Sequence, residues 1–163
     1  MKVDSVIIHD IRSTHNVGSI LRTCDGFGIG KVYVGGFTPY PIIPHDDRLP
    51  HISNKLTKDI AKTALGAEKT IEIELYEDLA ELIQRLKDSG TKVVALEQSD
   101  SSVNIRDFIT PKENVALLLG REVEGIDQKY LDMCDYVVEI PMVGLKESFN
   151  VSVATGIALY SLT

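Results

Sequence analysis

A run near the N-terminus, His15–Arg22, combines residue types that could hold a charged substrate. Asn16 is a favourable residue for a helix start, and Gly18 stands one helical turn before Arg22, which predicts free space beside the guanidinium. An arginine outside the apolar face of its helix could bind a phosphate. The alternative that Asn16 only caps the helix and Arg22 is only a solvated residue stays open on this evidence.

Two glycines bracket two acids directly after the most apolar stretch of the chain, Val115–Leu119. Gly120 would let a ligand approach the backbone closely. Glu122 would cost stability unless it meets a cation or backbone donors. A plain acidic turn between Gly120 and Gly125 is the alternative.

The third segment joins Ile140-Pro141-Met142 to Ser148-Phe149-Asn150, and no charged side chain follows Glu147. A terminal helix this apolar must be buried nearly all round, within the fold or against a second subunit. Ser148 and Asn150 also favour a helix start, so capping is their alternative role.

Several other chemistries lack their motifs. The glycines of Gly26–Lys31 do not form a Walker A loop, because Asp25 and Val32 stand where that motif needs Gly and Ser or Thr. They follow a helix and do not have the spacing of a dinucleotide-binding fingerprint, so we expect them to end that helix. No Gly-x-Ser-x-Gly elbow anchors a hydrolase triad.

Neither the cysteines nor the histidines indicate a metal centre. Cys24 and Cys134 stand 110 positions apart, which predicts two reduced, buried thiols. His45 and His51 flank two aspartates, but they lie in a proline-rich stretch that rarely fixes metal geometry. We therefore expect no metal site.

Strands and helices are predicted to alternate along the chain. Helical spacing covers Val17–Phe27 and Leu79–Leu86, the second with Gly90 as a stop. The expected strands are Ser5–His9, Lys31–Val34, Thr70–Leu75, Lys92–Leu96, Val115–Leu119 and Tyr136–Ile140. This pattern predicts an α/β fold with a mostly parallel sheet, helices on both faces, and a ligand site at the carboxyl ends of the strands.

Residues Phe37–Asn54 contain four prolines and are expected to form a long loop. Loops of this length are often lids or partner-binding segments, and disorder is the alternative.

Composition describes one globular domain. The chain has 163 residues, 44% of them hydrophobic, and a net charge of −7, which excludes collagen-like and disordered classes. No apolar run approaches the ~18 residues of a membrane span, and residues 1–8 lack a signal-peptide cleavage site, so we expect a cytoplasmic protein without membrane contact.

Charge is unevenly distributed. Residues 1–66 carry a net +2 with all four histidines, whereas residues 67–163 carry −9. The first part could supply a local phosphate-binding face, and a neutral solvated surface is the alternative.

Taken in order, the three segments resemble the SpoU (TrmH) family of RNA ribose methyltransferases, of the SPOUT class. The resemblance spans nearly the whole chain and rests on Asn16-x5-Arg22 with Cys24-Asp25-Gly26-Phe27-Gly28, on Gly120-x-Glu122-x-x-Gly125, and on Ile140-Pro141-Met142 with Ser148-x-Asn150. Phe149 replaces the usual Leu or Met, and Arg121-Glu122-Val123 replaces the common Asn-Glu-Gly. These departures affect the expected shape of the pocket rather than its chemistry.

The resemblance implies one domain over residues 1–163, with a deep trefoil knot in its C-terminal part. Many relatives carry an extra N-terminal RNA-binding domain, and we expect this chain to have no separate RNA-binding extension. It implies a homodimer that binds S-adenosylmethionine largely through backbone groups. The positions matching the family's cofactor site are Leu96, Gly120, Ile140, Met142, Ser148 and Phe149. Those matching its catalytic or substrate positions are Asn16, Arg22, Glu122, Ser148 and Asn150.

The implied reaction moves a methyl group from a sulfonium to a ribose 2′-hydroxyl of RNA. We expect Arg22 to position a phosphate and stabilise developing oxyanion charge, because a guanidinium holds its proton too tightly to act as a base. Asn16 and Asn150 would orient Arg22 and the ribose, Ser148 would contact the substrate or cofactor, and Glu122 would hold the Arg22 helix in place.

We expect transfer RNA rather than ribosomal RNA as the substrate, because the domain stands alone, with an accessory protein as one means of RNA selection. Two alternatives remain open: a doubly wound signalling or nucleotide-binding module, and a catalytically idle RNA-binding SPOUT homologue.

Overall fold

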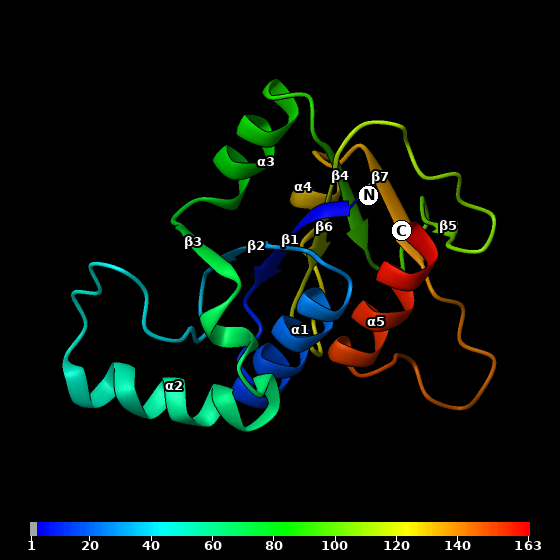
Figure 1. Ribbon diagram of the computed structural model, residues 1–163. Helices are drawn as coiled ribbons and strands as arrows, with labels where there is room; N and C mark the ends of the chain where they lie inside the picture. Colours follow the sequence, from blue (N-terminus) through cyan, green and yellow to red (C-terminus); the bar gives the residue numbers. More distant parts are fainter. Residues whose placement is uncertain (1–2) are drawn as a thin grey trace.

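The computed structural model describes residues 3–163; Met1 and Lys2, part of the N-terminal stretch considered above, lie outside it. One sheet contains seven strands of the described chain, and every pairing in it is parallel. The strands are β1 Val3–His9, β2 Lys31–Gly35, β3 Glu72–Tyr76, β4 Lys92–Leu96, β5 Val103–Asn104, β6 Val115–Leu119 and β7 Tyr136–Glu139. Their spatial order is β3-β2-β1-β6-β4-β7-β5 (Figure 1).

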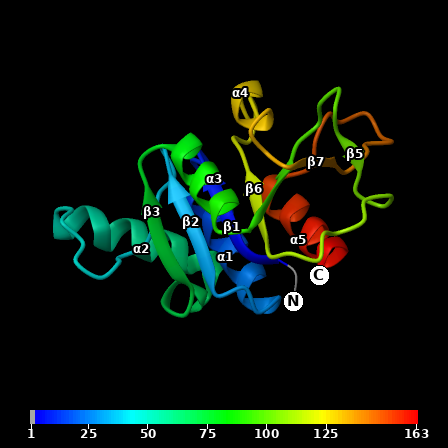
Figure 2. The ribbon, with the colours of Figure 1, turned by 90° about the horizontal axis from the view of Figure 1, so that it is seen from above.

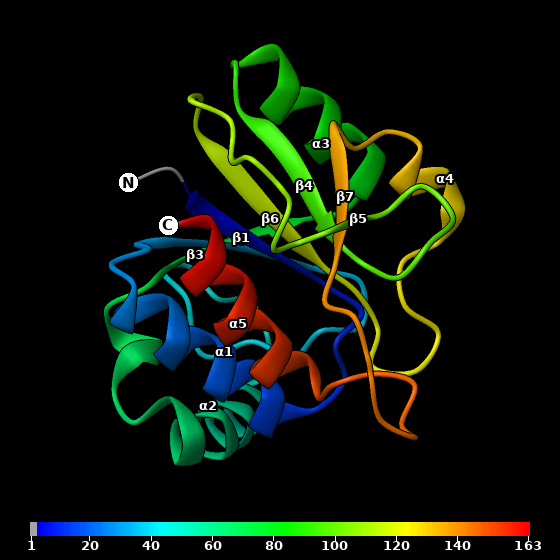
Figure 3. The same cartoon turned by 90° about the vertical axis from the view of Figure 1, so that its right-hand side faces the viewer.

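Helices cover both faces of the sheet, as the sequence predicts. Residues of α1, α2 and α5 pack on one face, and residues of α3 and α4 pack on the other (Figure 3). The helices are α1 Thr14–Gly26, α2 Pro50–Ala64, α3 Leu79–Asp88, α4 Gln128–Leu131 and α5 Val151–Leu162, with a 3₁₀ turn at Ala67–Lys69.

The central strands read as continuous apolar runs because both of their faces are buried. Along β6, Leu117 and Leu119 face the α1 side, whereas Ala116 and Leu118 face the α3 side. All five residues of this strand are buried, and β6 lies between β1 and β4 in the sheet.

Most strand predictions are confirmed to within a residue or two. Lys92–Leu96 and Val115–Leu119 have the predicted bounds, and the predicted strand over residues 70–75 begins at Glu72 instead. The two-residue strand β5 was not predicted, because Val103–Asn104 is too short to show a hydrophobic period.

Helix ends follow ordinary capping chemistry. The Asp78 carboxylate caps α3 by accepting from the backbone N–H groups of Ala80 and Glu81. Gly90 follows this helix with a φ of 86°, as expected for a stop signal. Gly28, with a φ of 69°, likewise lies in the turn that ends α1.

The proline-rich loop is shorter than predicted. It was expected to reach Asn54, but α2 begins at Pro50. Proline is tolerated at the first position of a helix because its missing N–H would have no partner there. The loop over residues 37–49 and the first turns of α2 project from the body of the molecule (Figure 2).

The uncharged C-terminal helix is buried on only part of its surface within this chain. Thr155, Ala158, Leu159 and Leu162 are buried, whereas Val153 is 51% exposed and Tyr160 is 80% exposed. Burial all round within one chain is therefore excluded, and cover by a second subunit stays a prediction. Among the described helices, none has the length and apolarity to cross a membrane.

Candidate active site at the carboxyl edge of the sheet

A cavity of about 230 Å³ opens where β4, β6 and β7 end. Its walls come from the strand ends, the segment after β6, and the segment from residue 139 into α5. The lining residues are Leu96, Glu97, Gln98, Leu119, Gly120, Arg121, Glu122, Val123, Gly125, Glu139, Ile140, Glu147, Ser148, Phe149, Val151 and Ala154. Its position agrees with the rule that open parallel sheets bind ligands outside the carboxyl ends of their strands.

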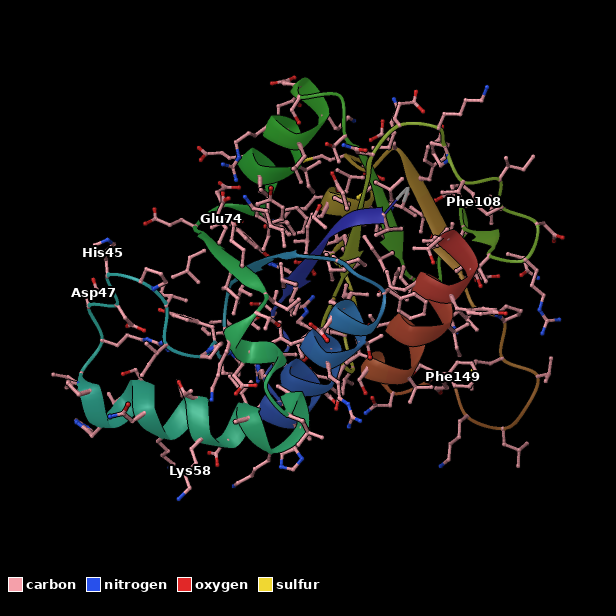
Figure 4. All side chains as sticks on the ribbon, viewed as in Figure 1. His45, Asp47, Lys58, Glu74, Phe108 and Phe149 are labelled. Atoms are coloured by element: carbon pink, nitrogen blue, oxygen red, sulfur yellow. The ribbon has the colours of Figure 1, made fainter. Side chains whose placement is uncertain are left out.

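Five of the six predicted cofactor positions line this cavity: Leu96, Gly120, Ile140, Ser148 and Phe149. They come from four separate parts of the chain, and the fold brings them to one place. Phe149 lies just before α5, near the loop over residues 141–148 (Figure 4). Met142, two residues beyond Ile140, is half-buried but does not line the cavity.

Gly120 has a structural role that differs from the one expected. A Cβ at this position would collide with Cγ1 of Ile126 and would lie 3.0 Å from the backbone of Gly125 and Ile126. The missing side chain therefore lets the Gly120–Ile126 turn close on itself. The expected approach of a ligand to the backbone of Gly120 stays a prediction.

Glu97 holds the same turn from the neighbouring strand, and sequence reasoning missed it. Its Oε2 accepts the backbone N–H of Ile126 at 2.9 Å, and its Oε1 accepts that of Gln98 at 2.8 Å. A side chain on Gly125 would collide with this carboxylate. The one available signal was an acid directly after the apolar strand β4, which also describes an ordinary solvated residue.

Glu122 meets backbone donors, as its position in the sequence requires. Its Oε1 accepts from the backbone N–H of Ser13 and from Nδ2 of Asn16, both at 3.3 Å, and its Oε2 accepts from the backbone N–H of Arg12 at 3.4 Å. The carboxylate thus lies at the start of α1, where the partial positive charge of a helix favours an anion.

Asn16 connects Glu122 to α5. Because a carboxylate only accepts hydrogen bonds, Asn16 presents its amide N–H to Glu122 and its carbonyl to Asn150. Nδ2 of Asn150 donates to that carbonyl at 3.1 Å. Asn150 also caps α5, since its Oδ1 accepts from the backbone N–H and the hydroxyl of Ser152. Three of the five predicted catalytic residues therefore form one hydrogen-bonded chain.

The cap of α1 is Ser13, so the prediction that Asn16 caps this helix is wrong. The Ser13 hydroxyl accepts from the backbone N–H of Asn16 at 3.2 Å. The side chain of Asn16 is therefore available for Glu122 and Asn150.

Arg22 lies on the solvent side of α1, away from this chain of hydrogen bonds. It stands about 120° around the helix from Asn16 and does not line the cavity. Its side chain is exposed and has no hydrogen bond or ion pair within residues 3–163. Ser148 does line the cavity, and its side chain is exposed.

Gly18 does not make room beside Arg22 as expected. It is buried, and a Cβ there would collide with Oγ1 of Thr63 and the carbonyl oxygen of Ile60. Its missing side chain allows α1 and α2 to cross closely.

The cavity wall is rich in carboxylates. Glu97, Glu122, Glu139 and Glu147 all line it, and the cationic Arg121 is paired with Asp127. Such a wall favours a ligand that carries positive charge and disfavours an anion. The described residues include no group of three His, Cys, Asp or Glu side chains placed to hold a metal ion.

The thiols lie away from the cavity and are not poised for reaction. Burial raises the pKa of Cys24 to about 12 and that of Cys134 to about 12. Both are free cysteines.

Comparison with known proteins identifies the family to which this chain belongs. Residues 47–160 match the model of the SpoU rRNA Methylase family. The tRNA (guanosine(18)-2′-O)-methyltransferase of Aquifex aeolicus is 31% identical over 155 residues, which are 95% of this chain and 66% of that protein. The chain spans 57% to 66% of the length of the first curated relatives it matches.

Solved structures have the same fold. The A. aeolicus TrmH/SpoU tRNA-modifying enzyme superposes with a TM-score of 0.79 at 27% identity, over 99% of this chain and 74% of that one. An AdoMet-bound rRNA methyltransferase from Sinorhizobium meliloti superposes with a TM-score of 0.81 at 25% identity, over 97% of this chain and 54% of that one.

Proposed function

The chain belongs to the SpoU rRNA methylase family, and from this premise we propose that it methylates a ribose 2′-hydroxyl of RNA with S-adenosylmethionine as methyl donor. The observation that carries the proposal is the position of the cavity directly beside the Glu122–Asn16–Asn150 chain. A donor site and a ribose-orienting site are thereby adjacent. Transfer RNA is the first substrate to test, because the A. aeolicus relative is named for it.

The cavity wall fits this donor. Leu96, Ile140 and Phe149 offer apolar surface to a purine, and the four carboxylates suit a molecule with a sulfonium and an ammonium group. The same carboxylates would repel the phosphates of a nucleotide, which argues against a nucleotide-binding module. When bound, S-adenosylmethionine supplies an activated methyl group on sulfur.

The protein's own residues would then align the ribose and stabilise charge. The Asn150 carbonyl is occupied by Ser152, and one of its two N–H groups is used on Asn16, so one N–H stays available to a ribose oxygen. The Ser148 hydroxyl offers a second contact at the cavity wall. Preorganised donors of this kind act most strongly on the oxyanion that develops as the hydroxyl loses its proton.

Arg22 would hold an RNA phosphate beside that oxyanion. Its guanidinium has no partner within the described chain, so nothing in the protein competes for it. Because Arg22 does not line the cavity of its own chain, the proposal includes a second subunit whose Arg22 reaches this cavity. A homodimer would also cover Val153 and Tyr160 on α5.

The family's trefoil knot is part of the proposal. Its support is the path of the chain: β7 lies beyond β4 in the sheet, yet α5 returns to pack on α1. The connecting segment lies against the region after β4, where Nε2 of Gln98 donates to the carbonyl of Glu147 at 2.9 Å. An enzyme acting on transfer RNA would work in the cytoplasm.

The test is methyl transfer followed by identification of the product. The protein is incubated with tritiated S-adenosylmethionine and unmodified transfer RNA or ribosomal RNA, and the digested RNA is analysed for 2′-O-methylnucleosides by mass spectrometry. We expect 2′-O-methylation at one mapped nucleotide and its loss in Asn150→Ala, with Lys112→Ala as the matched surface control. Cofactor binding without any transfer would instead indicate the catalytically idle homologue, and a methylated base would contradict the proposed ribose chemistry.

A further inference from the structure

Four cationic or titratable side chains form a straight line along α2. His51, Lys55, Lys58 and Lys62 follow the spacing i, i+4, i+7, i+11, and all four are exposed. At 100° per residue they fall within about 60° of the helix circumference and extend over about 16 Å. We refer to these four residues as the α2 stripe.

The α2 stripe faces away from the body of the molecule. Ile60 and Ala64, which bury α2 against the core, lie on the opposite side of the helix. Lys58 points outward from α2 into solvent (Figure 4). Seen from above, the first turns of α2 project from the molecule (Figure 2), and all four side chains of the stripe are exposed.

The positive charge of the stripe is only partly neutralised. Lys55 and Lys58 have no hydrogen bond or ion pair within residues 3–163. Lys62 pairs with Asp59 at 2.8 Å, and that hydrogen bond, with Lys55 and His15 adding to it, holds the pKa of Asp59 below its usual range. Of the two acids in the preceding loop, Asp46 is already engaged by Arg48.

We infer that the α2 stripe binds backbone phosphates of the substrate RNA, outside the nucleotide that is methylated. This inference rests on the proposed function. Exposed lysines commonly neutralise RNA phosphates, and this row of three lysines and a histidine stands out on a chain of net charge −7. None of the four stripe positions is apolar, and the exposed Ile52 and Leu65 lie at opposite ends of α2, so they do not form the continuous apolar face by which basic helices bind membranes.

The position of the stripe suits an RNA that also reaches the cavity. α2 packs against α1, which carries Asn16 and Arg22, and α1 in turn packs against α5. In Figure 4, Lys58 lies at the lower left of the molecule, below α2, and Phe149 lies right of the centre, at the start of α5. A folded RNA that crosses from α2 over α1 to the start of α5 would contact both.

Charge reversal tests the inference. The variant Lys55→Glu/Lys58→Glu is compared with Arg106→Glu/Lys112→Glu, which makes the same change in net charge at exposed positions on the β5 side. Binding of fluorescently labelled, unmodified transfer RNA is measured by anisotropy from 50 to 200 mM KCl. S-adenosylmethionine affinity is measured by calorimetry as a check on the cavity.

We expect the stripe variant to weaken transfer RNA binding by about tenfold or more at 100 mM KCl and to lower the salt dependence, as the slope of log K against log[KCl], by about two. The control variant should change both by much less, and cofactor affinity should stay within twofold in both. Equal weakening in the two variants, no weakening, or no RNA binding by the wild type would overturn the inference. The inference would also be overturned if the stripe variant lost binding to phosphatidylserine vesicles that the wild type shows but kept the RNA affinity of the wild type.

The outcome is separable from that of the proposed function. Loss of RNA binding in the stripe variant together with no methyl transfer by the wild type would support the surface and reject the enzyme. Normal 2′-O-methylation by the wild type together with unchanged RNA binding in the stripe variant would support the enzyme and reject the RNA-binding surface.

Discussion

At the scale of single residues, Glu122 connects the cavity to the start of α1. Its two oxygens accept from two backbone N–H groups and from Asn16, so one side chain both stabilises the helix start and fixes an amide that faces the site. Stability and geometry therefore depend on the same carboxylate.

Replacing Glu122 by alanine should lower the stability of the fold and release the side chain of Asn16. Unpaired donors at the start of α1 should cost about 1 to 2 kcal/mol in the free energy of unfolding, which is roughly 2–8 °C in Tm for a domain of this size. Glu122→Gln, which keeps one acceptor, should retain part of that stability. Thermal melts measure the effect, and an unchanged Tm in Glu122→Ala would show that these long hydrogen bonds contribute nothing.

Replacing Arg22 separates function from fold. Because Arg22 is exposed and unpaired within the described chain, Arg22→Ala should leave Tm and S-adenosylmethionine affinity near wild type. Single-turnover methyl transfer should fall by roughly a hundred-fold or more, the effect of losing one preorganised donor.

Arg22→Lys is the informative companion. Its rate of methyl transfer should be little higher than that of Arg22→Ala, since an ammonium lacks the planar fork that can hold a phosphate and a ribose oxygen together. A lysine variant with a near-normal rate would reduce Arg22 to a generic positive charge, and an alanine variant with a near-normal rate would remove it from the mechanism.

At the scale of elements, the loop over residues 37–49 is held by one arginine. The Arg48 guanidinium pairs with Asp46, donates to the carbonyls of Tyr40 and Pro41 at 3.0 Å each, and lies 3.7 Å from the centre of the Tyr40 ring. Arg48 therefore joins the middle of this loop to its end, whereas Thr38 and the backbone N–H of Phe37 tie its start to the segment after β1.

Acid should release this loop before the rest of the fold. Hydrogen bonds from Arg48 hold the pKa of Asp46 well below its usual range, so the stabilisation is present above the unfolded value of about 3.9 and is lost as pH falls below it. Limited proteolysis with pepsin across pH 2–5 should show cleavage in residues 37–49 first. Arg48→Ala should show the same cleavage already at the top of that range, and a loop equally resistant in that variant would contradict the assignment.

Sequence periodicity was sufficient to predict the strands and helices that have strong hydrophobic patterns. It was insufficient to predict the role of a residue that depends on tertiary contacts. The buried run Val115–Leu119 could be placed as a strand because both of its faces are apolar. Gly18 and Gly120 could be marked as unusual, but their neighbours Ile60 and Ile126 come from tertiary packing and turn closure, which local spacing does not specify.

The candidate site was likewise predictable in part: its residues could be named from the sequence, but their contacts could not. The resemblance assembled Asn16, Glu122 and Asn150 as a set, and the structure supplied the hydrogen bonds that join them. Glu97 was missed because its function depends on a turn 29 residues away, and nothing around it in the sequence records that contact.

At the scale of the whole molecule, the exposed side of α5 and the absence of Arg22 from the lining of the cavity lead us to expect a site shared between two subunits. A heterodimer of one Arg22→Ala chain and one Ile140→Arg chain, whose cavity is filled by a long cation, should regain methyl transfer. One of its two sites would combine an intact cavity with an intact Arg22.

Differently tagged chains, co-expressed and purified over both tags, provide this heterodimer. Each homodimeric variant serves as the inactive control, with thermal melts to confirm folding. A heterodimer as inactive as its parents, or a fully active monomer in sedimentation, would place the whole site within one chain.

The position of β6 has a consequence for how the protein is made. β1 leaves the ribosome before the other strands of this sheet, yet its second neighbour is residues 115–119, more than a hundred residues later. Until then a nascent chain can assemble only β1, β2 and β3, with an apolar strand edge open on one side. Slow translation or a shortage of chaperones between residues 76 and 115 should therefore favour aggregation, whereas the same delay after residue 119 should be tolerated.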